Sequence, residues 1–518
     1  TSAGSTHNIF IGNSAGGGTW ANVASNYNVG IGNYSMDGAL DGATENTALG
    51  YETLSQITTE DANVAIGYRA MSGGGGTQNI AIGADSMYQG PTGGTNYAIG
   101  RYTMMDCNAG SNALSSHTNI AMGHAALGGT WADAASNYNI AIGHTAMDAG
   151  VNGALYNMAM GYAALGALTS GGSNVAIGHG AGSALTTGVG NIILGRTAGD
   201  AMTTNSGVIA IGYAAASALN NNNGSYSVII GYEAGQNMTS ANPNHLMGYR
   251  SGYAITTGGQ NVASGYETLR YNQTGYGNVA MGYYAAQNAT SSLNVAIGYE
   301  AGRGKSSAPY NSGESNISIG SYTNHTVSTG KRNVSIGGRA GYAMETGTDN
   351  TLLGNNAGYN VKHAVGATII GGYAGRYASG SYNTFIGYNA GDGATTSAPF
   401  SSGEENIAIG RNTMRVFTTG HSNVVVGNQA GYNINSGHEN TIMGYQAAYN
   451  LTSADNNVII GYQTGYNLTT SRYNVLIGDK AGYNLQESSA NNENVMIGFN
   501  AGYAGDYTWP QSTDNVYI

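Results

Sequence analysis

The chain repeats one short pattern of polar and apolar positions from its first residues to its last. An asparagine is followed by three apolar residues and a glycine, as in Asn174-Val175-Ala176-Ile177-Gly178. This motif occurs 28 times, and 15 of the 27 intervals between successive motif glycines are 17 residues long. No interval is shorter than 16 residues, and the longest is 23. A fixed minimum with variable additions is typical of one turn of backbone that carries loop insertions.

Three further columns of the aligned repeat are nearly constant. The residue four before the glycine is Asn in 25 of 28 copies, the exceptions being Val208, Ser227 and Ala367. The residue three after the glycine is Ala, Ser or Thr in all 28 copies, and Tyr directly follows the glycine 12 times. The asparagine column predicts a ladder of stacked amides that satisfy one another's hydrogen bonds. The tyrosine column predicts either a packed aromatic ladder, which we favour, or a stripe on which carbohydrate stacks.

The three apolar residues between asparagine and glycine predict a short β-strand. The run is too short for a helix, and its first residue is mostly β-branched. Alternation along a strand places Val175 and Ile177 on one face and Ala176 on the other. Since both faces are apolar, we expect both to be covered. We expect one face to meet a second sheet of the same chain and the small Ala176 face to meet another chain; an Ala176 face left in water is the alternative.

The rest of each repeat predicts a corner, a second short strand and a return loop. Gly178 supplies the conformational freedom for the corner, and the polar, glycine-containing segment 185–188 is typical of a loop. Stacked repeats of this kind form a β-solenoid. We therefore predict an all-β parallel solenoid, one continuous repeat region over residues 1–518, with about 29 rungs that stack to roughly 140 Å.

Composition narrows the functional classes. Charged residues make up 8% of the chain and the net charge is −11. No basic patch is visible, which argues against nucleic acid as a partner. The single Cys107 excludes an intrachain disulfide and is more simply incidental than reactive. There is no apolar run long enough to span a membrane and no signal peptide, and the chain begins and ends within repeats, so we expect a fragment that lacks its targeting and anchoring segments.

Candidate chemistry is sparse. The segment 302–306 (Gly-Arg-Gly-Lys-Ser) superficially matches a phosphate loop, but Tyr299 stands where the pattern requires its first glycine. His124 and His144 occupy the same slot in neighbouring repeats, where stacking is favoured over a metal site because no carboxylate or thiol is in register. The acidic residues form no pair at a fixed register. We therefore predict no catalytic, cofactor-binding or metal-binding residues and no enzymatic activity.

Candidate binding features lie in the insertions. Two pairs of insertions are near copies of each other, 17–28 with 128–139 and 307–314 with 397–404. They place four aromatic residues at one edge: Trp20, Trp131, Tyr310 and Phe400. Loops on a rigid scaffold often carry binding, although these side chains could equally cap their own rung. Glycosylation stays open at the Asn-X-Thr triplets, including those that begin at Asn237, Asn288, Asn450 and Asn467.

The motif Asn-Val-Ala-Ile-Gly, followed by an alanine and a glycine-containing loop, resembles the head repeats of trimeric autotransporter adhesins. It is also similar to repeat regions of phage tail fibres and of tail-fibre-like bacterial surface proteins, for which Asn-Thr-Phe-Ile-Gly-Tyr-Asn-Ala-Gly at 383–391 is a typical phrase. The resemblance covers essentially the whole chain. It implies a left-handed parallel β-roll in which three chains pack around one axis. The chain departs from the adhesin pattern by its longer repeat and by having no heptad stalk, membrane-anchor barrel or self-cleaving chaperone domain.

These features together lead us to expect an extracellular structural fibre or adhesin rod, on a cell surface or a virion. It would be a homotrimer that spaces and presents attachment surfaces, with surface glycans as partners and no membrane insertion in this part of the chain. One alternative is a glycan-cleaving fibre enzyme, which would need paired carboxylates in a groove. Another is a filament subunit that polymerises end to end through its open strand edges. An ice- or mineral-binding surface would need flat threonine arrays, whereas the threonines here lie mostly in loops.

Overall fold

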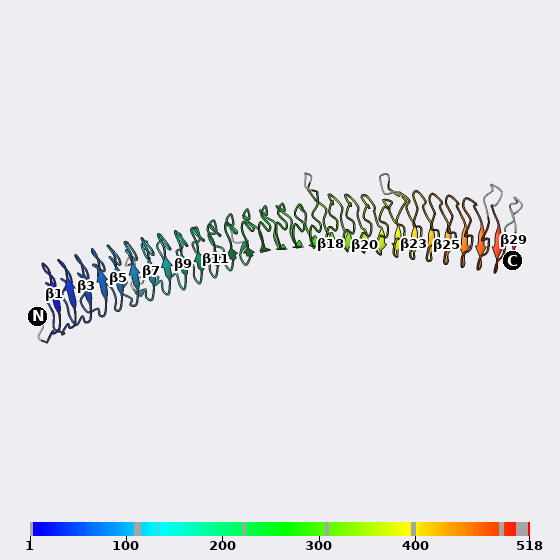
Figure 1. Cartoon of the computed structure of the whole chain (residues 1–518). Helices are drawn as coiled ribbons and strands as arrows, with labels where there is room; N and C mark the ends of the chain where they lie inside the picture. Colours follow the sequence, from blue (N-terminus) through cyan, green and yellow to red (C-terminus); the bar gives the residue numbers. More distant parts are fainter. Residues whose placement is uncertain are drawn as a thin grey trace. The chain divides into compact units, whose positions relative to one another are not determined.

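A computed structural model describes residues 4–107, 115–132, 134–220, 224–305, 310–394, 400–485, 492–503 and 516–518. The described residues form 29 short β-strands and no α-helix. They divide into two compact units, Thr1–Gln260 and Asn261–Ile518. In each unit, successive turns of the chain stack as a parallel β-solenoid (Figure 1). The predicted all-β parallel solenoid of roughly 17-residue turns is therefore confirmed, and its continuity over 1–518 stays a prediction.

The first unit contains fourteen strands, each of three residues. They are β1 (Ile9–Ile11), β2 (Val29–Ile31), β3 (Thr47–Leu49), β4 (Val64–Ile66), β5 (Ile80–Ile82), β6 (Tyr97–Ile99), β7 (Ile120–Met122), β8 (Ile140–Ile142), β9 (Met158–Met160), β10 (Val175–Ile177), β11 (Ile192–Leu194), β12 (Ile209–Ile211), β13 (Val228–Ile230) and β14 (His245–Met247).

The second unit contains fifteen strands, all of three residues except the last. They are β15 (Val262–Ser264), β16 (Val279–Met281), β17 (Val295–Ile297), β18 (Ile317–Ile319), β19 (Val334–Ile336), β20 (Thr351–Leu353), β21 (Thr368–Ile370), β22 (Thr384–Ile386), β23 (Ile407–Ile409), β24 (Val424–Val426), β25 (Thr441–Met443), β26 (Val458–Ile460), β27 (Val475–Ile477), β28 (Val495–Ile497) and β29 (Val516–Tyr517).

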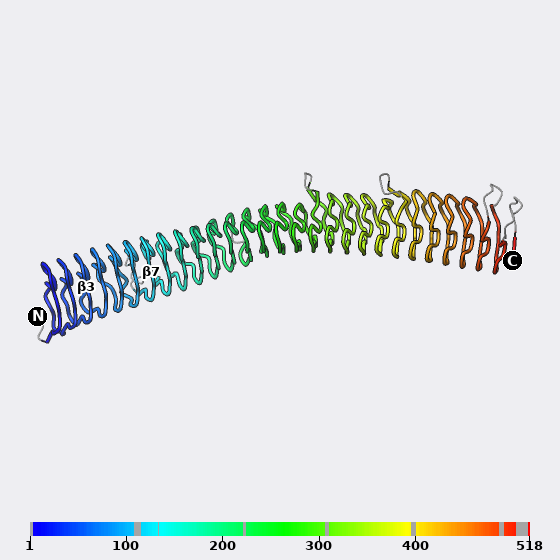
Figure 2. Tube along the Cα trace, in the orientation of Figure 1, coloured from blue at the N-terminus to red at the C-terminus, as the bar shows by residue number. Residues whose placement is uncertain are grey.

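Within each unit, strands that follow one another in the chain also lie side by side (Figure 2). β10 pairs in parallel with β11, so that Ala176 lies opposite Ile193 and Ile177 opposite Leu194. The same register places the middle residue of each strand over the middle residue of the next. Since the insertions lie between strands, loops of different length leave this register unchanged.

Buried asparagine side chains form the predicted ladder. Oδ1 of Asn157 accepts hydrogen bonds from the backbone nitrogen and from Nδ2 of Asn174, both at 3.0 Å. Nδ2 of Asn174 also donates to the carbonyl of Gly188 at 2.8 Å, and the same pattern passes on to Asn191. Where Val208 interrupts the column, its backbone nitrogen still donates to Oδ1 of Asn191 at 2.9 Å. Each amide thus satisfies buried backbone groups of two successive rungs, as interior polar groups must be.

The predicted assignment of the two strand faces is wrong. The middle residue, such as Ala176, is fully buried inside the coil, whereas Val175 is half-buried and Ile177 is 40% exposed. Ala176 points inward because the interior of the coil is narrow. Its small side chain leaves room for a side chain from the opposite side of the same coil. The larger branched residues therefore form the outward face. A partner chain would contact the Val175 and Ile177 face, not the Ala176 face that the sequence predicted.

Two inward positions share the space inside each coil, the strand centre and the residue four after the motif glycine. In many early coils a central alanine faces a large residue, as with Ala48 and Leu54, which are both fully buried. In many later coils the sizes are exchanged, as with Phe385 and Gly391. A Cβ on Gly391 would lie 2.6 Å from the Phe385 ring. The two columns thus compensate each other in volume, as a close-packed interior requires.

The predicted second strand is also absent from the described coils, where a series of turns follows the motif glycine. Gly180 and Gly182 have φ values of 67° and 57°, and other coils place side-chain-bearing residues in the same conformation, such as Tyr34 (59°) and Met36 (49°). Alternate residues in the left-handed region break the pleat of a strand. Hydrogen bonds between rungs persist nevertheless, since the nitrogen of Gly182 donates to the carbonyl of Ala198 at 3.0 Å.

At the motif glycine of most coils, a side chain would clash with the backbone of the next rung. Gly178 has a φ of 136°, and a Cβ placed there would lie 2.5 Å from the carbonyl oxygen of Gly195 in the next rung. Gly190 offers a matched comparison, because its φ of 72° is also positive but a Cβ there would meet nothing within 4 Å. Strain alone acts at Gly190, whereas strain and a backbone clash act together at Gly178.

We predict that Gly178→Ala lowers the local free energy of unfolding by at least about 3 kcal/mol, and that Gly190→Ala lowers it by about 1 kcal/mol. Native-state hydrogen exchange of the amides in residues 174–195 measures both values, because it reports opening of a single region. Equal losses in the two variants would show that the close approach of successive rungs at Gly178 is not a constraint.

Candidate functional site

The strands of each unit present an outward face. It consists of the first and third residue of every strand, and none of these residues is Asp, Glu, Lys or Arg. Among the most exposed in the first unit are Ile9, Ile11, Leu49, Ile99, Met122, Met160, Ile177 and Met247. Among the most exposed in the second unit are Val262, Met281, Ile336, Ile409, Val424 and Met443. Each unit therefore carries an uncharged, largely apolar sheet face that the chain itself does not cover.

A column of stacked aromatic rings borders this face. Tyr51 and Tyr68 stack at a centroid distance of 5.5 Å, and Tyr445 and Tyr462 stack at 5.3 Å, with interplanar angles of 10° in both pairs. Further runs continue the column, namely Tyr162–His179, Tyr213–Tyr232–Tyr249 and Tyr266–Tyr283–Tyr299. This geometry confirms the aromatic ladder. Stacked rings cover one another's faces, so a sugar could not lie flat on a ring within a run.

The two histidines singled out in the sequence belong to this column. His124 stacks on His144 at 4.9 Å with an interplanar angle of 13°, and His144 stacks in turn on Tyr162. Within the described ranges, no group of three or more His, Cys, Asp or Glu side chains is arranged to hold a metal ion. Both imidazoles thus act as members of the aromatic stack, as predicted.

The aromatic residues of the insertions pack against the solenoid, the two tryptophans on their own coil and the other two residues on an earlier coil. Trp131 is fully buried and its indole nitrogen donates to the carbonyl of Leu127 at 3.2 Å. Trp20 is half-buried and meets Phe10 edge to face. Tyr310 stacks on Tyr271 at 5.3 Å, and Phe400 stacks on Tyr377 at 6.4 Å. The alternative in which these side chains cap their own rung therefore describes Trp20 and Trp131, whereas Tyr310 and Phe400 contact earlier coils. The neighbouring segments 306–309 and 395–399 lie outside the described residues.

The described part of the phosphate-loop-like segment 302–306 and Cys107 both have surroundings that give them a structural role. Gly302 lies in a coil corner with a φ of 54°, Lys305 pairs with Glu345 at 3.1 Å, and Ser306 lies outside the described residues. No described residue near this segment forms the helix that a phosphate loop requires. Cys107 is fully buried, and burial raises the pKa of its thiol well above the usual range, which makes it unreactive.

Two of the glycosylation triplets lie in a second amide ladder. Nδ2 of Asn450 donates to Oδ1 of Asn467 at 3.0 Å, and Nδ2 of Asn467 donates to Oδ1 of Asn484 at 2.7 Å. Asn288 is buried. The amide nitrogens that would carry a glycan at Asn450 and Asn467 are thus engaged in the folded chain.

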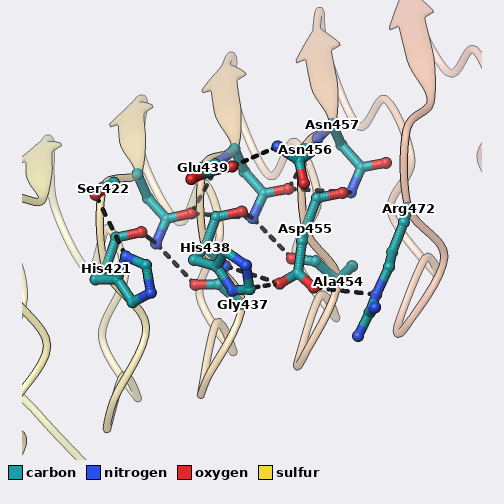
Figure 3. A network of polar contacts seen from close by, with 12 residues as sticks. His421, Ser422, Gly437, His438, Glu439, Ala454, Asp455, Asn456, Asn457 and Arg472 are labelled. Atoms are coloured by element: carbon teal, nitrogen blue, oxygen red, sulfur yellow. Dashed lines mark hydrogen bonds and ion pairs between the residues drawn. The ribbon is translucent and has the colours of Figure 1, made fainter.

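A cluster of charged and histidine side chains spans four successive rungs of the second unit (Figure 3). The buried carboxylate of Asp455 lies 2.8 Å from Nδ1 of His438 and 3.0 Å from Nε of Arg472, and His421 stacks on His438 at 4.7 Å. The hydroxyl of Ser422 lies 3.3 Å from Nδ1 of His421, a neighbour in sequence, and makes no hydrogen bond to His438. The cluster has the geometry of an ionic clamp between rungs, and it lacks a nucleophile positioned on the Asp–His pair.

A longer polar chain runs through the interior edge of the second unit. Oε2 of Glu300 accepts a hydrogen bond from Arg303 at 2.8 Å and lies 2.7 Å from Nε2 of His325. Nε of Arg303 donates to Gln287, whose Nε2 donates to Glu267 at 2.7 Å. Burial alone would raise the pKa of Glu300, but the hydrogen bonds from His325 and Arg303 outweigh burial and lower that pKa below its ordinary value of 4.5.

The chain matches no protein-family model and no curated protein sequence. None of the described segments is a helix with the length and apolar character needed to span a bilayer. Function is therefore inferred from the surfaces described above, and the resemblance to adhesin and tail-fibre repeats stays a prediction.

The sequence also shows a column five residues after the motif glycine, to which sequence reasoning assigned no function. In the second unit it contains stacked tyrosines, including Tyr432–Tyr449–Tyr466–Tyr483, and it contains Arg376, Asp392 and Arg415 between two aromatic runs. The alignment of repeats shows both the tyrosines and the interruption. What it does not show is that a return turn brings this column to the surface.

Acid should weaken the second unit through Glu300. Because its folded pKa is lowered, its contribution to stability is fully present above the ordinary pKa of 4.5 and is lost as pH falls through the folded pKa. We predict that the stability difference between the wild type and Glu300→Gln shrinks as pH is lowered from 6 to 3, measured by urea unfolding. Glu314→Gln, which removes an exposed ion-pair partner of Lys331, should show little difference at any pH. A constant difference for Glu300→Gln would contradict this assignment.

Proposed function

We propose that the protein is a structural fibre segment, located outside the cell, that assembles as a homotrimer through the outward strand faces and presents attachment surfaces. The observation that carries the proposal is the uncovered apolar face. In the first unit, 14 strands at a spacing of about 4.8 Å give it a length of roughly 65 Å, with a width of about 7 Å between alternate residues. An area of roughly 450 Å² lies within the range of the largest apolar patch on soluble monomers, and such patches often mark an interaction surface.

Other copies of the same chain suit this face better than an unrelated partner. Rungs of a second copy repeat at the same spacing, so that side chains of one face can fill the gaps of another along the whole unit. The face contains no Asp, Glu, Lys or Arg, and association therefore buries no such charge. Three copies around one axis, the left-handed coil and attachment to glycan-bearing surfaces follow from the resemblance and form part of the proposal.

Assembly should depend on the outward face alone. We predict a solution mass of about 158 kDa, three chains of 52.8 kDa, by light scattering. A variant with four carboxylates on the face should shift to the single-chain mass while its far-UV circular dichroism is retained, because it would bury like charges. The substitutions are Met160→Glu, Ile177→Glu, Met281→Glu and Ile336→Glu.

The matched control adds the same charge to exposed loop positions and should stay trimeric. Its substitutions are Ser170→Glu, Thr187→Glu, Thr329→Glu and Thr419→Glu. A wild-type mass near 53 kDa at every concentration, or equal dissociation of both variants, would rule out assembly through the outward strand face.

A further inference from the structure

A shallow open cleft of about 320 Å³ lies on the second unit, beside the interruption in the column five residues after the motif glycine. Its walls come from three successive coils and are lined by Arg339, Asn356, Tyr359, Tyr373, Arg376 and Tyr377. Two guanidinium groups, three phenols and one amide thus converge on one small surface. No apolar side chain belongs to this lining, which favours a polar ligand.

The cleft lies at the end of an aromatic stack where, among the described residues, Tyr359 has a stacked ring on one side only. His325 stacks on Tyr342 at 5.1 Å, and Tyr342 stacks on Tyr359 at 4.9 Å. The next position of the column is Arg376, and among the described residues no ring stacks on the other side of Tyr359. The run of rings therefore ends at Tyr359, which lines the cleft and offers ring surface to a flat, partly apolar ligand such as a pyranose ring.

The two arginines of the cleft differ in their partners. Arg376 is held by Asp392 through two hydrogen bonds of 3.0 and 2.9 Å, and its guanidinium lies 4.5 Å from the centre of the Tyr377 ring. Arg339 is exposed and forms no ion pair with any described residue. One wall of the cleft is thus braced by an ion pair, while the other presents a cation whose donors are open to a ligand.

The surrounding sequence is locally basic in an acidic chain. Residues 300–415 contain 9 of the 16 Lys and Arg residues but 7 of the 27 Asp and Glu residues, so this stretch has a formal charge of +2 against −11 for the whole chain. An anionic ligand is therefore attracted to this part of the second unit more than to the rest.

We propose that this cleft binds a carboxylated saccharide, with the ligand carboxylate on Arg339 and the apolar face of its sugar ring on Tyr359. The planar guanidinium donates two parallel hydrogen bonds to a carboxylate, which gives both charge and orientation. Asn356 and the phenols supply donors and acceptors for sugar hydroxyls. The inference rests on the proposed attachment function and names the ligand class that the fibre would recognise.

The test is calorimetric titration of the full chain with three probes at equal ionic strength: a galacturonic acid trisaccharide, the carboxyl-reduced neutral trisaccharide and inorganic phosphate. We expect the acidic trisaccharide to bind at least about tenfold more tightly than either of the others. Equal binding of the neutral sugar would exclude the Arg339 contact. Phosphate binding as tight as that of the trisaccharide would show an anion site without sugar recognition and would overturn the proposal.

Two matched pairs of variants locate the site. Arg339→Gln should weaken the acidic trisaccharide about tenfold, whereas Arg332→Gln, which removes the same charge from a pair with Asp349, should change affinity less than about twofold. Tyr359→Leu should weaken the trisaccharide but not phosphate. Tyr449→Leu, whose ring is covered on both sides by Tyr432 and Tyr466, should change neither.

Equal effects within either pair would overturn the proposal. Light scattering on the same samples separates this inference from the fibre function. If the chain has a trimeric mass but does not bind the saccharide, the proposed cleft is refuted and assembly is not. If a single chain binds the saccharide, the proposed cleft is supported and assembly is refuted.

Discussion

The buried asparagine ladder is the interaction on which the rest of the fold depends. Each Asn174-type amide joins the backbone of its own rung to the rung before it and the rung after it, so the strands can pair in one register only. A shift by one residue would turn every inward side chain outward and leave several buried hydrogen-bonding groups without partners. The ladder therefore specifies which residues become core and which become surface.

From that register follow a narrow coil and a tight stack. Successive rungs approach so closely at the motif glycines that a Cβ on Gly178 would overlap the next carbonyl. The interior holds only two main columns of side chains, and these exchange volume from Ala48 with Leu54 to Phe385 with Gly391. The interior is filled by the strand-centre residues and by the residues four after the motif glycine. The branched residues on either side of each strand centre therefore face outward, where assembly is proposed.

Much of the fold could be predicted because the repeat shows it directly. The period, the strand positions, the asparagine ladder and the stacking of His124 on His144 all follow from columns of identical residues. The direction of Ala176 could not be predicted from apolar alternation alone, since both faces of the strand are apolar. The sequence does contain a sign of this direction. In many coils with a small strand-centre residue, the residue four after the motif glycine is large, and in many others the sizes are reversed, which only a shared interior explains.

The candidate cleft at Arg339 and Tyr359 was hidden for a different reason. Its residues lie two, five and six positions after motif glycines of three coils, and only the turns bring these positions together. Left-handed conformations at residues such as Asn356 and Tyr373 re-aim the backbone at every second position. In the predicted second strand, these side chains would instead point alternately to the two faces of the strand. No cleft would then be expected there.

The measurement that tests the ladder most directly is native-state hydrogen exchange of Asn174→Ala, with exposed Asn152→Ala as the control. Asn174→Ala removes partners from the nitrogen of Asn191 and the carbonyl of Gly188, so the local free energy of unfolding around residues 174–195 should fall by at least about 3 kcal/mol. Asn152→Ala removes one exposed hydrogen bond and should lower it by less than about 1 kcal/mol. A loss for Asn174→Ala no larger than that of the control would contradict the account, because the register would then be set by something other than the buried amides.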